Sequence, residues 1–250
     1  MSEHWDIYFG YIDEKIASFV LDMDVWQEID TEEYSQAIAV RLKIKEPNEE
    51  GFPIGSEAEK INEMEDSLNE FVSLKNIINI GRITTDGIRD IIFYSNQEEK
   101  NYLTEAVDQF IKPTGYEFEI FNIEEDENWE FYFDFLYPNQ YQQQHMGNRK
   151  VVDSLEESGD ALEVPRKVEH WLYFENIKTL KRFIKAIKKE GFSIEEESTE
   201  MSEEGKYSLS ISRIDSVDFT SINEVTDLLV EVSEKYKGEY DGWETFVINK

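Results

Sequence analysis

The stretch that decides the fold lies in the last part of the chain. It opens with Tyr207-Ser-Leu-Ser-Ile-Ser-Arg-Ile-Asp215 and closes with Gly238-Glu-Tyr-Asp-Gly-Trp-Glu-Thr-Phe-Val-Ile248. The first run alternates apolar and polar side chains, which is typical of a half-buried strand. Apolar residues at helical spacing lie between the two runs: Ile222, Val225, Leu228, Leu229 and Val232. The pattern predicts a strand, a helix that Gly238 ends, and a last strand running to Val247 or Ile248.

The residues before this stretch complete a recurring plan. A strand is expected at 168–174, followed by a helix that Asn176 caps and Gly191 ends, and then by a strand that begins at Phe192. The order is therefore β-α-β-β-α-β. This order predicts a ferredoxin-like domain, in which one antiparallel sheet carries two helices on one face.

The first half of the chain repeats the plan between Ser35 and Phe121. Residues 35–45 alternate as a strand, helices are expected after the loop at 46–55 and after Asn96, and Asp86-Gly87 marks a tight turn. A β-hairpin from Trp5 to Leu21 precedes it. The fold class expected is α+β, with two ferredoxin-like (βαββαβ) antiparallel-sheet domains. The boundary is expected near Pro138, which gives domains at 1–137 and 138–250.

The composition indicates a folded protein that is strongly acidic. Hydrophobic residues make up 40% of the 250 residues, enough for a core in each half, and the net charge is −31. Phosphate backbones repel carboxylates, so no direct nucleic-acid contact is expected, whereas a protein partner with a basic surface would be attracted. The chain has no cysteine, no apolar run long enough for a membrane span and no signal-like N-terminus. We therefore expect a cytoplasmic protein that does not bind membranes.

The sequence carries no motif of a catalytic or cofactor site. His4, His145 and His170 are far apart and do not show the spacing of metal ligands. Neither a phosphate-binding glycine loop nor a nucleophile elbow occurs. We expect no catalytic residue, no cofactor, no metal and no enzymatic activity.

Two kinds of feature are candidates for protein contact. The aromatic and acidic candidates are Trp129, Asp134, Arg213, Asp215, Tyr240, Asp241 and Trp243. Each has a structural alternative: Trp129 and Trp243 pack in a core, the second at a bulge of an edge strand, and Arg213 pairs with Asp215 or Asp241. The other candidate is a basic run on one helix, which either contacts RNA or an acidic partner or is a solvated face. Its residues are Lys178, Lys181, Arg182, Lys185, Lys188 and Lys189.

Both halves resemble known families. Arg213-Ile-Asp-Ser216 and Gly238-Glu-Tyr-Asp-Gly-Trp-Glu244, with the strand at 168–174, resemble the regulator of ribonuclease E activity B family over about residues 138–250. The first half resembles an uncharacterised domain family often found directly upstream of that module. The matching residues there are Trp5-Asp-Ile-Tyr-Phe9, Gly81-Arg-Ile-Thr-Thr-Asp-Gly87 and Tyr132-Phe-Asp-Phe-Leu-Tyr-Pro138.

The resemblance implies a ferredoxin-like fold and a regulatory role. Members of the regulator family inhibit ribonuclease E by binding its scaffold region, and they alter RNA decay without being enzymes. The function expected is therefore a non-enzymatic binding protein whose partner is an RNA-processing enzyme. Two other classes remain open: an acidic interaction protein of another kind, such as a nuclease-immunity protein or nucleic-acid mimic, and an unrecognised hydrolase.

Overall fold

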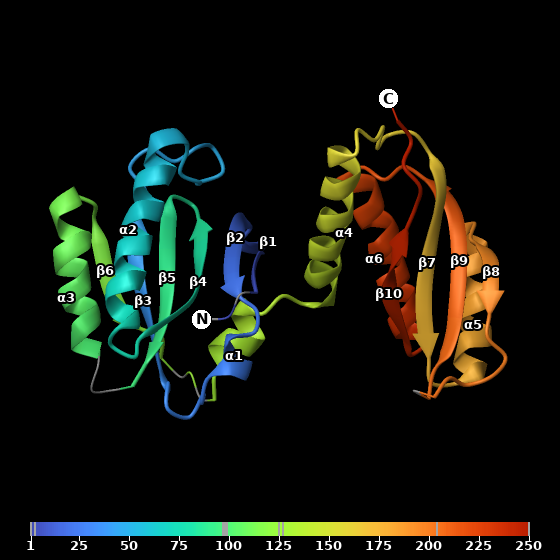
Figure 1. The fold of residues 1–250 in the computed structure, drawn as a ribbon, viewed down its shortest axis with the longest axis horizontal. Coiled ribbons are helices and arrows are strands. Elements are labelled where there is room, and N and C mark those ends of the chain that lie inside the picture. Colours follow the sequence, from blue (N-terminus) through green and yellow to red (C-terminus); the bar gives the residue numbers. More distant parts are fainter. Residues whose placement is uncertain are drawn as a thin grey trace. The chain divides into compact units, whose positions relative to one another are not determined.

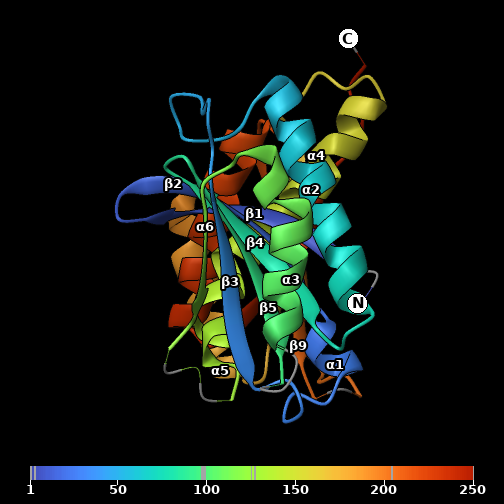
Figure 2. The ribbon, with the colours of Figure 1, turned by 90° about the vertical axis from the view of Figure 1, so that its left-hand side faces the viewer.

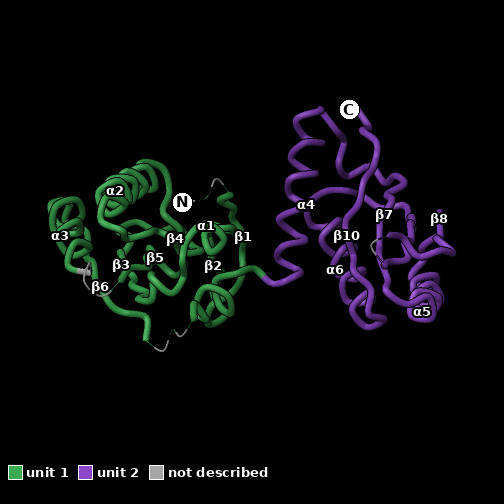
Figure 3. Tube along the Cα trace, turned by 60° about the horizontal axis from the view of Figure 1, so that its bottom comes forward, with its two compact units in different colours: residues 1–138 green, residues 139–250 purple. Residues whose placement is uncertain are grey.

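The chain folds into two compact units, residues 1–138 and 139–250 (Figure 3). The computed structural model describes residues 2, 4–96, 100–124, 126, 128–203 and 205–249. Each unit contains one antiparallel sheet with helices packed on it (Figure 1). The prediction of an α+β protein with two antiparallel sheets is confirmed.

The sheet of the first unit has six strands in the order β1-β2-β4-β5-β3-β6, all antiparallel to their neighbours. The run from β3 to β6 has the βαββαβ order, and the hairpin of β1 and β2 extends the sheet beyond β4. The elements are β1 (Trp5–Ile12), β2 (Lys15–Asp22), α1 (Val25–Glu28), β3 (Gln36–Lys43), α2 (Gly55–Ser73), β4 (Ile78–Thr85), β5 (Ile88–Ser95), α3 (Lys100–Phe110), η1 (Lys112–Thr114), β6 (Phe118–Asn122) and the π-helix η2 (Phe131–Leu136).

Alternation along β3 assigns the two faces of this sheet. Ile38, Val40 and Leu42 are fully buried in a core that α2 and α3 complete. Figure 2 shows these two helices covering the same face of the sheet. Ala39 and Arg41 point to the opposite face, as the sequence pattern predicts. The run Ser56-Glu-Ala-Glu59 is typical of a capping box, but α2 begins at Gly55 without a side-chain cap.

Two tight turns of this sheet have a similar backbone conformation, but only one of them has residue types that adopt it readily. Asp86 and Gly87 join β4 to β5 with φ values of 46° and 79°, as their sequence predicts. Asp13 and Glu14 join β1 to β2 with φ values of 47° and 65°. Such turns require positive φ at both positions, which glycine and aspartate tolerate and glutamate does not. Glu14 therefore holds the strained position that Gly87 occupies in the other turn.

Replacing Glu14 with Gly is expected to stabilise the first unit by about 0.5–1 kcal/mol. The substitution removes the steric cost of a left-handed glutamate, and the greater flexibility of glycine in the unfolded chain offsets part of this gain. Urea unfolding measures the change. Glu14→Ala is the matched control, because alanine removes the same charge but keeps the steric cost. An equal gain in both variants would assign the effect to charge and not to the turn.

The second unit has a four-stranded sheet in the order β10-β7-β9-β8, again antiparallel throughout. Side chains from α5 and α6 pack with Leu172, Phe174, Leu209 and Ile211 in one core, so both helices cover the same face. The elements are α4 (Gln140–Glu157), β7 (Arg166–Phe174), α5 (Ile177–Ile187), η3 (Lys188–Glu190), β8 (Ser193–Glu197), β9 (Tyr207–Asp215), α6 (Phe219–Lys235) and β10 (Gly238–Glu244).

The helix ends of the second unit follow the sequence in part. Asn176 caps α5 as predicted, because its side chain accepts from the N–H of Lys178 at 2.8 Å. The prediction that Gly238 ends α6 is wrong, since Lys237 takes the left-handed conformation and Gly238 starts β10. Gly238 serves packing instead. A Cβ atom there would lie 2.3 Å from the ring of the buried Phe174.

The last strand is shorter than expected and ends at Glu244. The residues after it form a tail that is held by hydrogen bonds to the segment before β7. The N–H of Ala161 donates to the carbonyl of Ile248 at 2.8 Å, and the N–H of Ile248 donates to the carboxylate of Asp160 at 2.6 Å. The backbone of the tail is therefore anchored, while the side chains of Phe246 and Val247 remain exposed.

Candidate functional site

Trp129 is a core residue of the first unit. Its side chain is 2% exposed, stacks on the ring of Tyr94 at 3.9 Å between centroids, and donates from Nε1 to the carbonyl of Tyr34 at 2.8 Å. It therefore presents no surface to a partner, and its interpretation as a contact residue is replaced by a structural role. Burial raises the pKa of Tyr94 far above its usual range, and the hydrogen bond from Tyr94 to Asp126 acts in the same direction.

The π-helix that follows Trp129 does reach the surface. Asp134 is exposed, and the neighbouring Phe133 and Phe135 are 41% and 46% exposed. Phe133 lies edge-on to Trp26, with 5.8 Å between ring centroids. Of the candidates in this stretch, only Asp134 is placed where a partner can contact it.

Arg213 and Asp215 form a structural pair at the end of β9. The Nε atom of Arg213 donates to the carboxylate of Asp215 at 2.9 Å, and an amino group of Arg213 donates to the carbonyl of Glu190. The guanidinium also lies 4.3 Å from the centroid of the Phe192 ring. The sequence allowed Arg213 to pair with either Asp215 or Asp241, and the structure shows the pair with Asp215.

The run from Tyr240 to Trp243 forms a β-bulge on the edge strand. The register of β10 shifts between Tyr240 and Gly242, and Gly242 adopts a φ of 147°. The extra residue, Asp241, is exposed, and Trp243 returns to the core with 8% exposure. Its Nε1 atom donates to the buried side chain of Asn148 at 2.8 Å. Of the two alternatives for Trp243, the structure therefore shows the core position. Asp241 is the exposed residue of this run.

His170 is buried beside this bulge. Its Nδ1 atom lies 2.9 Å from the hydroxyl of Tyr240, and its Nε2 atom has no hydrogen-bond partner in the part of the chain that the structure describes. Burial, together with the nearby positive charge of Arg213, lowers the pKa of His170 to about 3. The imidazole is therefore neutral and enclosed in the core of the second unit.

The face of this sheet opposite α5 and α6 carries two large aromatic rings. Along β7 the side chains alternate, so Val168, His170, Leu172 and Phe174 are buried, while Lys167, Glu169, Trp171 and Tyr173 are half-buried on the other face. We call this the open sheet face. Trp171 pairs in register with Ser210, and Tyr173 pairs with Ser208. On its other side Tyr173 pairs with Glu239 of β10, and Trp171 lines a hollow together with Gly147 and Val151 of α4.

Carboxylates surround these rings. Glu169 and Glu195 share the ammonium of Lys167, at 2.7 and 2.9 Å. Glu239, opposite Tyr173 on β10, pairs with Lys206, whose ammonium also lies 5.9 Å from the Tyr173 ring. The ring of Tyr173 is thus already in contact with a cation. An aromatic surface with carboxylates on the same and neighbouring strands is chemically suited to a basic partner.

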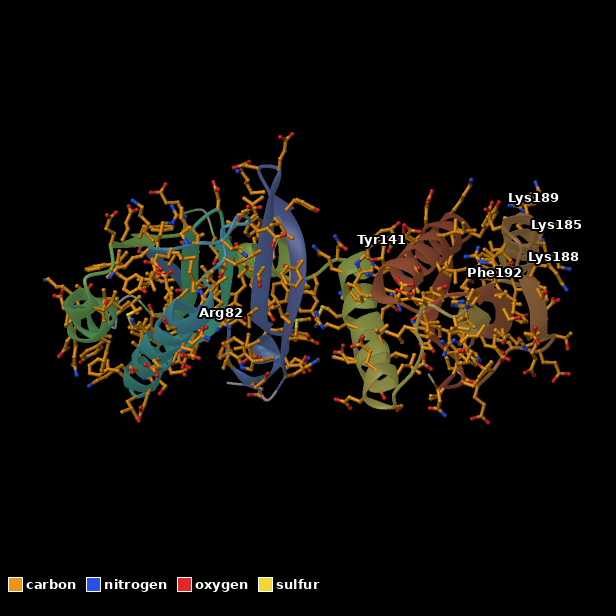
Figure 4. The ribbon with its side chains drawn as sticks, turned by 90° about the horizontal axis from the view of Figure 1, so that it is seen from above. Arg82, Tyr141, Lys185, Lys188, Lys189 and Phe192 are labelled. Carbon is orange, nitrogen blue, oxygen red and sulfur yellow. The ribbon has the colours of Figure 1, made fainter. Side chains whose placement is uncertain are left out.

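The outer face of α5 and η3 is basic. Their charged residues are all exposed, whereas Leu180, Phe183, Ile184 and Ile187 are buried against the sheet. Figure 4 shows Lys185, Lys188 and Lys189 together at one end of the second unit. The solvated face that the sequence offered as one interpretation is therefore present, and its charge is concentrated on one side.

The first unit has a hollow of about 520 Å³ on the sheet face opposite α2 and α3. Arg41 forms a two-pronged pair with Asp90 there, at 2.8 and 2.7 Å, and its guanidinium lies 4.9 Å from the ring centre of Phe121. The hydrogen bond from Arg41 to Asp90 raises the pKa of Arg41 above its ordinary value. Ile83, Ile92, Phe131 and Phe135 supply apolar lining.

Among the described residues, no three His, Asp or Glu side chains gather in a way that would hold a metal ion. No helix within the described ranges has the length and apolar character to cross a bilayer.

Sequence reasoning missed Trp171 and Tyr173 as surface residues. The signal was present in Arg166-Lys-Val-Glu-His-Trp-Leu-Tyr-Phe174, where alternate positions carry Lys, Glu, Trp and Tyr. The run quoted as a family marker near the C-terminus drew attention to Trp243, which the structure places in the core. Alternation within β7 is therefore the better guide to the half-buried aromatic side chains on the outer face of this sheet.

Comparisons with known proteins agree with the two-unit division. Residues 3–137 match the model described as "Family of unknown function (DUF695)", and residues 145–245 match the model described as "Regulator of ribonuclease activity B". Both predicted resemblances are thereby confirmed. No curated protein matches this chain.

Two solved structures show only weak similarity. A structure described as an unknown protein from Galdieria sulphuraria is 11% identical, with 85% of this chain and 99% of that chain covered and a TM-score of 0.24. A putative glycine cleavage system transcriptional repressor is 7% identical, with 84% and 98% covered and a TM-score of 0.27. Scores this low support no argument about fold or function. Because the first family model covers more than half of the 250 residues, the protein belongs to the family of unknown function DUF695, with a second unit that matches the regulators of ribonuclease activity B.

Proposed function

We propose that the protein is a non-enzymatic cytoplasmic regulator that inhibits a ribonuclease through protein–protein contact. The observation that carries the proposal is the match of residues 145–245, nearly all of the second unit, to a family described as regulating ribonuclease activity. The partner is then an RNA-processing enzyme. The role of the first unit is to be sought on its own surface, where Asp134 lies among exposed aromatic rings.

The open sheet face is the contact surface that we assign to this role. Tryptophan and tyrosine are the residue types most enriched among the side chains that dominate binding energy at interfaces. Trp171 and Tyr173 lie two residues apart on one strand and therefore on one face. Ser208 of β9, which pairs with Tyr173, is exposed and adds a hydroxyl group for hydrogen bonds. The face thus combines anchors with adaptable polar contacts.

Charge also favours an RNA-binding enzyme as partner. Enzymes that act on RNA carry Lys and Arg where the phosphates bind, and these surfaces attract a protein with a net charge of −31. Complementary charge raises the association rate and suppresses wrong partners, while the aromatic anchors supply most of the affinity. Glu169, Glu195 and Glu239 place carboxylates next to these anchors.

A capture and activity assay tests the proposal. The tagged full-length protein is expected to retain a ribonuclease from a lysate of its own source organism, and to lower the rate at which the purified enzyme cleaves RNA. The double variant Trp171→Ala/Tyr173→Ala is expected to lose at least about tenfold in affinity for that enzyme, the size expected for hot-spot aromatics. Calorimetry or surface plasmon resonance with the purified enzyme measures this loss.

Phe246→Ala is the matched control, because Phe246 is an aromatic residue of the same unit that is 58% exposed. It is expected to bind the enzyme as the natural protein does. Capture of no ribonuclease, or capture without any change in the rate of RNA cleavage, would contradict the proposed function. Unchanged affinity in the Trp171/Tyr173 variant would instead move the contact to another surface. Capture of a secreted toxin nuclease would support the immunity class.

A further inference from the structure

Five cations lie together on the outer face of α5 and η3 without a carboxylate partner. Their side chains are exposed, and none of them forms an ion pair or a hydrogen bond with another described residue. A sixth, Lys181, bonds Glu197 on β8. We call the five the basic face: Lys178, Arg182, Lys185, Lys188 and Lys189.

Such unpaired cations are rare in the rest of the molecule. The chain has 25 Lys and Arg residues against 56 Asp and Glu residues, so a carboxylate is close to most positions. Among the described side chains outside the basic face, only three cations lack a partner: Lys60, Lys235 and Lys237. More than half of the unpaired cations are therefore concentrated within twelve residues of one helical segment.

Solubility does not require this arrangement. Glutamate would solvate the outer face of an amphipathic helix as well as lysine, and it is the common choice elsewhere in this chain. The negative end of the helix dipole favours Lys185, Lys188 and Lys189, which lie near the C-terminus, but it opposes Lys178 in the first turn. Like charges three and four residues apart also repel each other. The full row of cations is best explained by an anionic partner.

The composition of the basic face distinguishes a phosphate chain from an acidic protein. Protein interfaces are depleted in lysine and need aromatic or apolar anchors at their centre. The described residues of α5 and η3 offer none outward, because the apolar residues of the helix point to the core. Cβ atoms of residues three or four apart lie about 5–6 Å from each other, which gives a regular row of charges. A row of lysines without anchors fits a repeating phosphate backbone.

We propose that the basic face binds the phosphate backbone of RNA without reading its sequence. The choice of RNA over another polyphosphate rests on the proposed function, since the substrate of a ribonuclease is present wherever that enzyme is bound. The net negative charge of the sequence led us to expect no direct contact with nucleic acid, and this inference differs from that expectation. Charges are screened beyond about 8–10 Å at physiological salt, so a ligand on this face senses the local cations more strongly than distant carboxylates.

Fluorescence anisotropy with a labelled 20-nucleotide single-stranded RNA tests the proposal on the full-length protein. We expect binding at 50 mM salt that weakens as salt rises. Five phosphate contacts predict a slope of about −3.5 in a plot of log affinity against log salt. The variant Lys185→Gln/Lys188→Gln/Lys189→Gln is expected to bind at least about tenfold more weakly and to reduce the slope by about 2.

Lys60→Gln/Lys235→Gln/Lys237→Gln is the matched control, because it removes three exposed, unpaired cations elsewhere and gives the same net charge. It is expected to retain the affinity and slope of the natural protein. Lys185→Arg/Lys188→Arg/Lys189→Arg is also expected to bind, since it keeps the charges. The absence of RNA binding by the natural protein, or an equal loss in both Gln variants, would overturn the proposal.

Poly-glutamate of matched length separates the two anionic partners. Competition equal to that of unlabelled RNA would overturn the assignment to RNA in favour of an acidic polypeptide. The two proposals also fail separately. If the Gln variant of the basic face still captures and inhibits the ribonuclease but the natural protein binds no RNA, only the further inference is lost. If RNA binds but no ribonuclease is captured or inhibited, only the proposed function is lost.

Discussion

Replacing Asp160 with Ala is expected to destabilise the second unit by about 3–5 kcal/mol, the cost of breaking a buried ion pair. The side chains of Asp160 and Arg166 are both completely buried and lie 2.6 Å apart. Arg166 also donates to the carbonyls of Ala161 and Phe246, and Asp160 accepts from the N–H of Ile248. Removing the carboxylate leaves a guanidinium charge without compensation inside the protein and frees the C-terminal tail.

Urea unfolding of the full-length protein measures this loss. Asp153→Ala is the matched control, because Asp153 is an exposed carboxylate on α4 of the same unit. Its effect is expected to stay within about 0.5 kcal/mol. The double variant Asp160→Leu/Arg166→Met is expected to lose much less than Asp160→Ala, since it removes both charges together. A loss below about 1 kcal/mol in Asp160→Ala would show that water reaches Arg166.

The parts of the fold that the sequence predicted are those set by local patterns. Alternation along residues 35–45 predicted β3 and its two faces, and Asp86-Gly87 predicted a tight turn, in which both residues adopt positive φ. Asn176 gave the start of α5. The expected cap of the second helix at Asn96 adjoins residues 97–99, which lie outside the described residues. These signals act over a few residues, so no knowledge of distant contacts is needed.

The predictions that were wrong concern residues whose roles depend on contacts with residues distant in the sequence. Gly238 was interpreted as a helix terminator because of its position, but the structure needs it because Phe174 of β7 lies against it. Ser221 with Glu224 is typical of a helix cap, but α6 is capped by Asp218, which accepts from the N–H of Ser221. Trp243 faces the core because Asn148, 95 residues away, accepts its hydrogen bond. A single sequence does not contain such pairings in readable form.

The same distinction separates family markers from contact surfaces in the second unit. The run from Tyr240 to Trp243 is easy to recognise because a bulge, a glycine with positive φ and a buried tryptophan together restrict its residues. The open sheet face and the basic face carry ordinary residue types on regular elements. Recognition therefore identifies the scaffold, and surfaces must be found from the exposure and charge of the folded chain.

Acidification is expected to destabilise the second unit through His170. The imidazole is buried, and its pKa is lowered to about 3, whereas an unfolded histidine titrates near 6.5. Between these two values the unfolded chain binds a proton that the folded protein excludes. The contribution of His170 is therefore fully present above pH 6.5 and is lost as the pH falls. The loss approaches about 1.4 kcal/mol for each pH unit below 6.5.

At pH 5.0 this one group is expected to cost about 2 kcal/mol relative to pH 8.0. The lower pH stays above the sequence pI of about 4.3, which keeps the protein charged and soluble. His170→Asn keeps a polar atom near the hydroxyl of Tyr240 but does not titrate, so its stability is expected to fall by about 2 kcal/mol less over this range. His145→Asn, on the surface of α4, is the control and is expected to leave the loss caused by His170 in place. Urea unfolding at both pH values measures the free energy of unfolding of each variant. An equal pH dependence in the natural protein and His170→Asn would mean that His170 accepts a proton in the folded state as readily as in the unfolded chain.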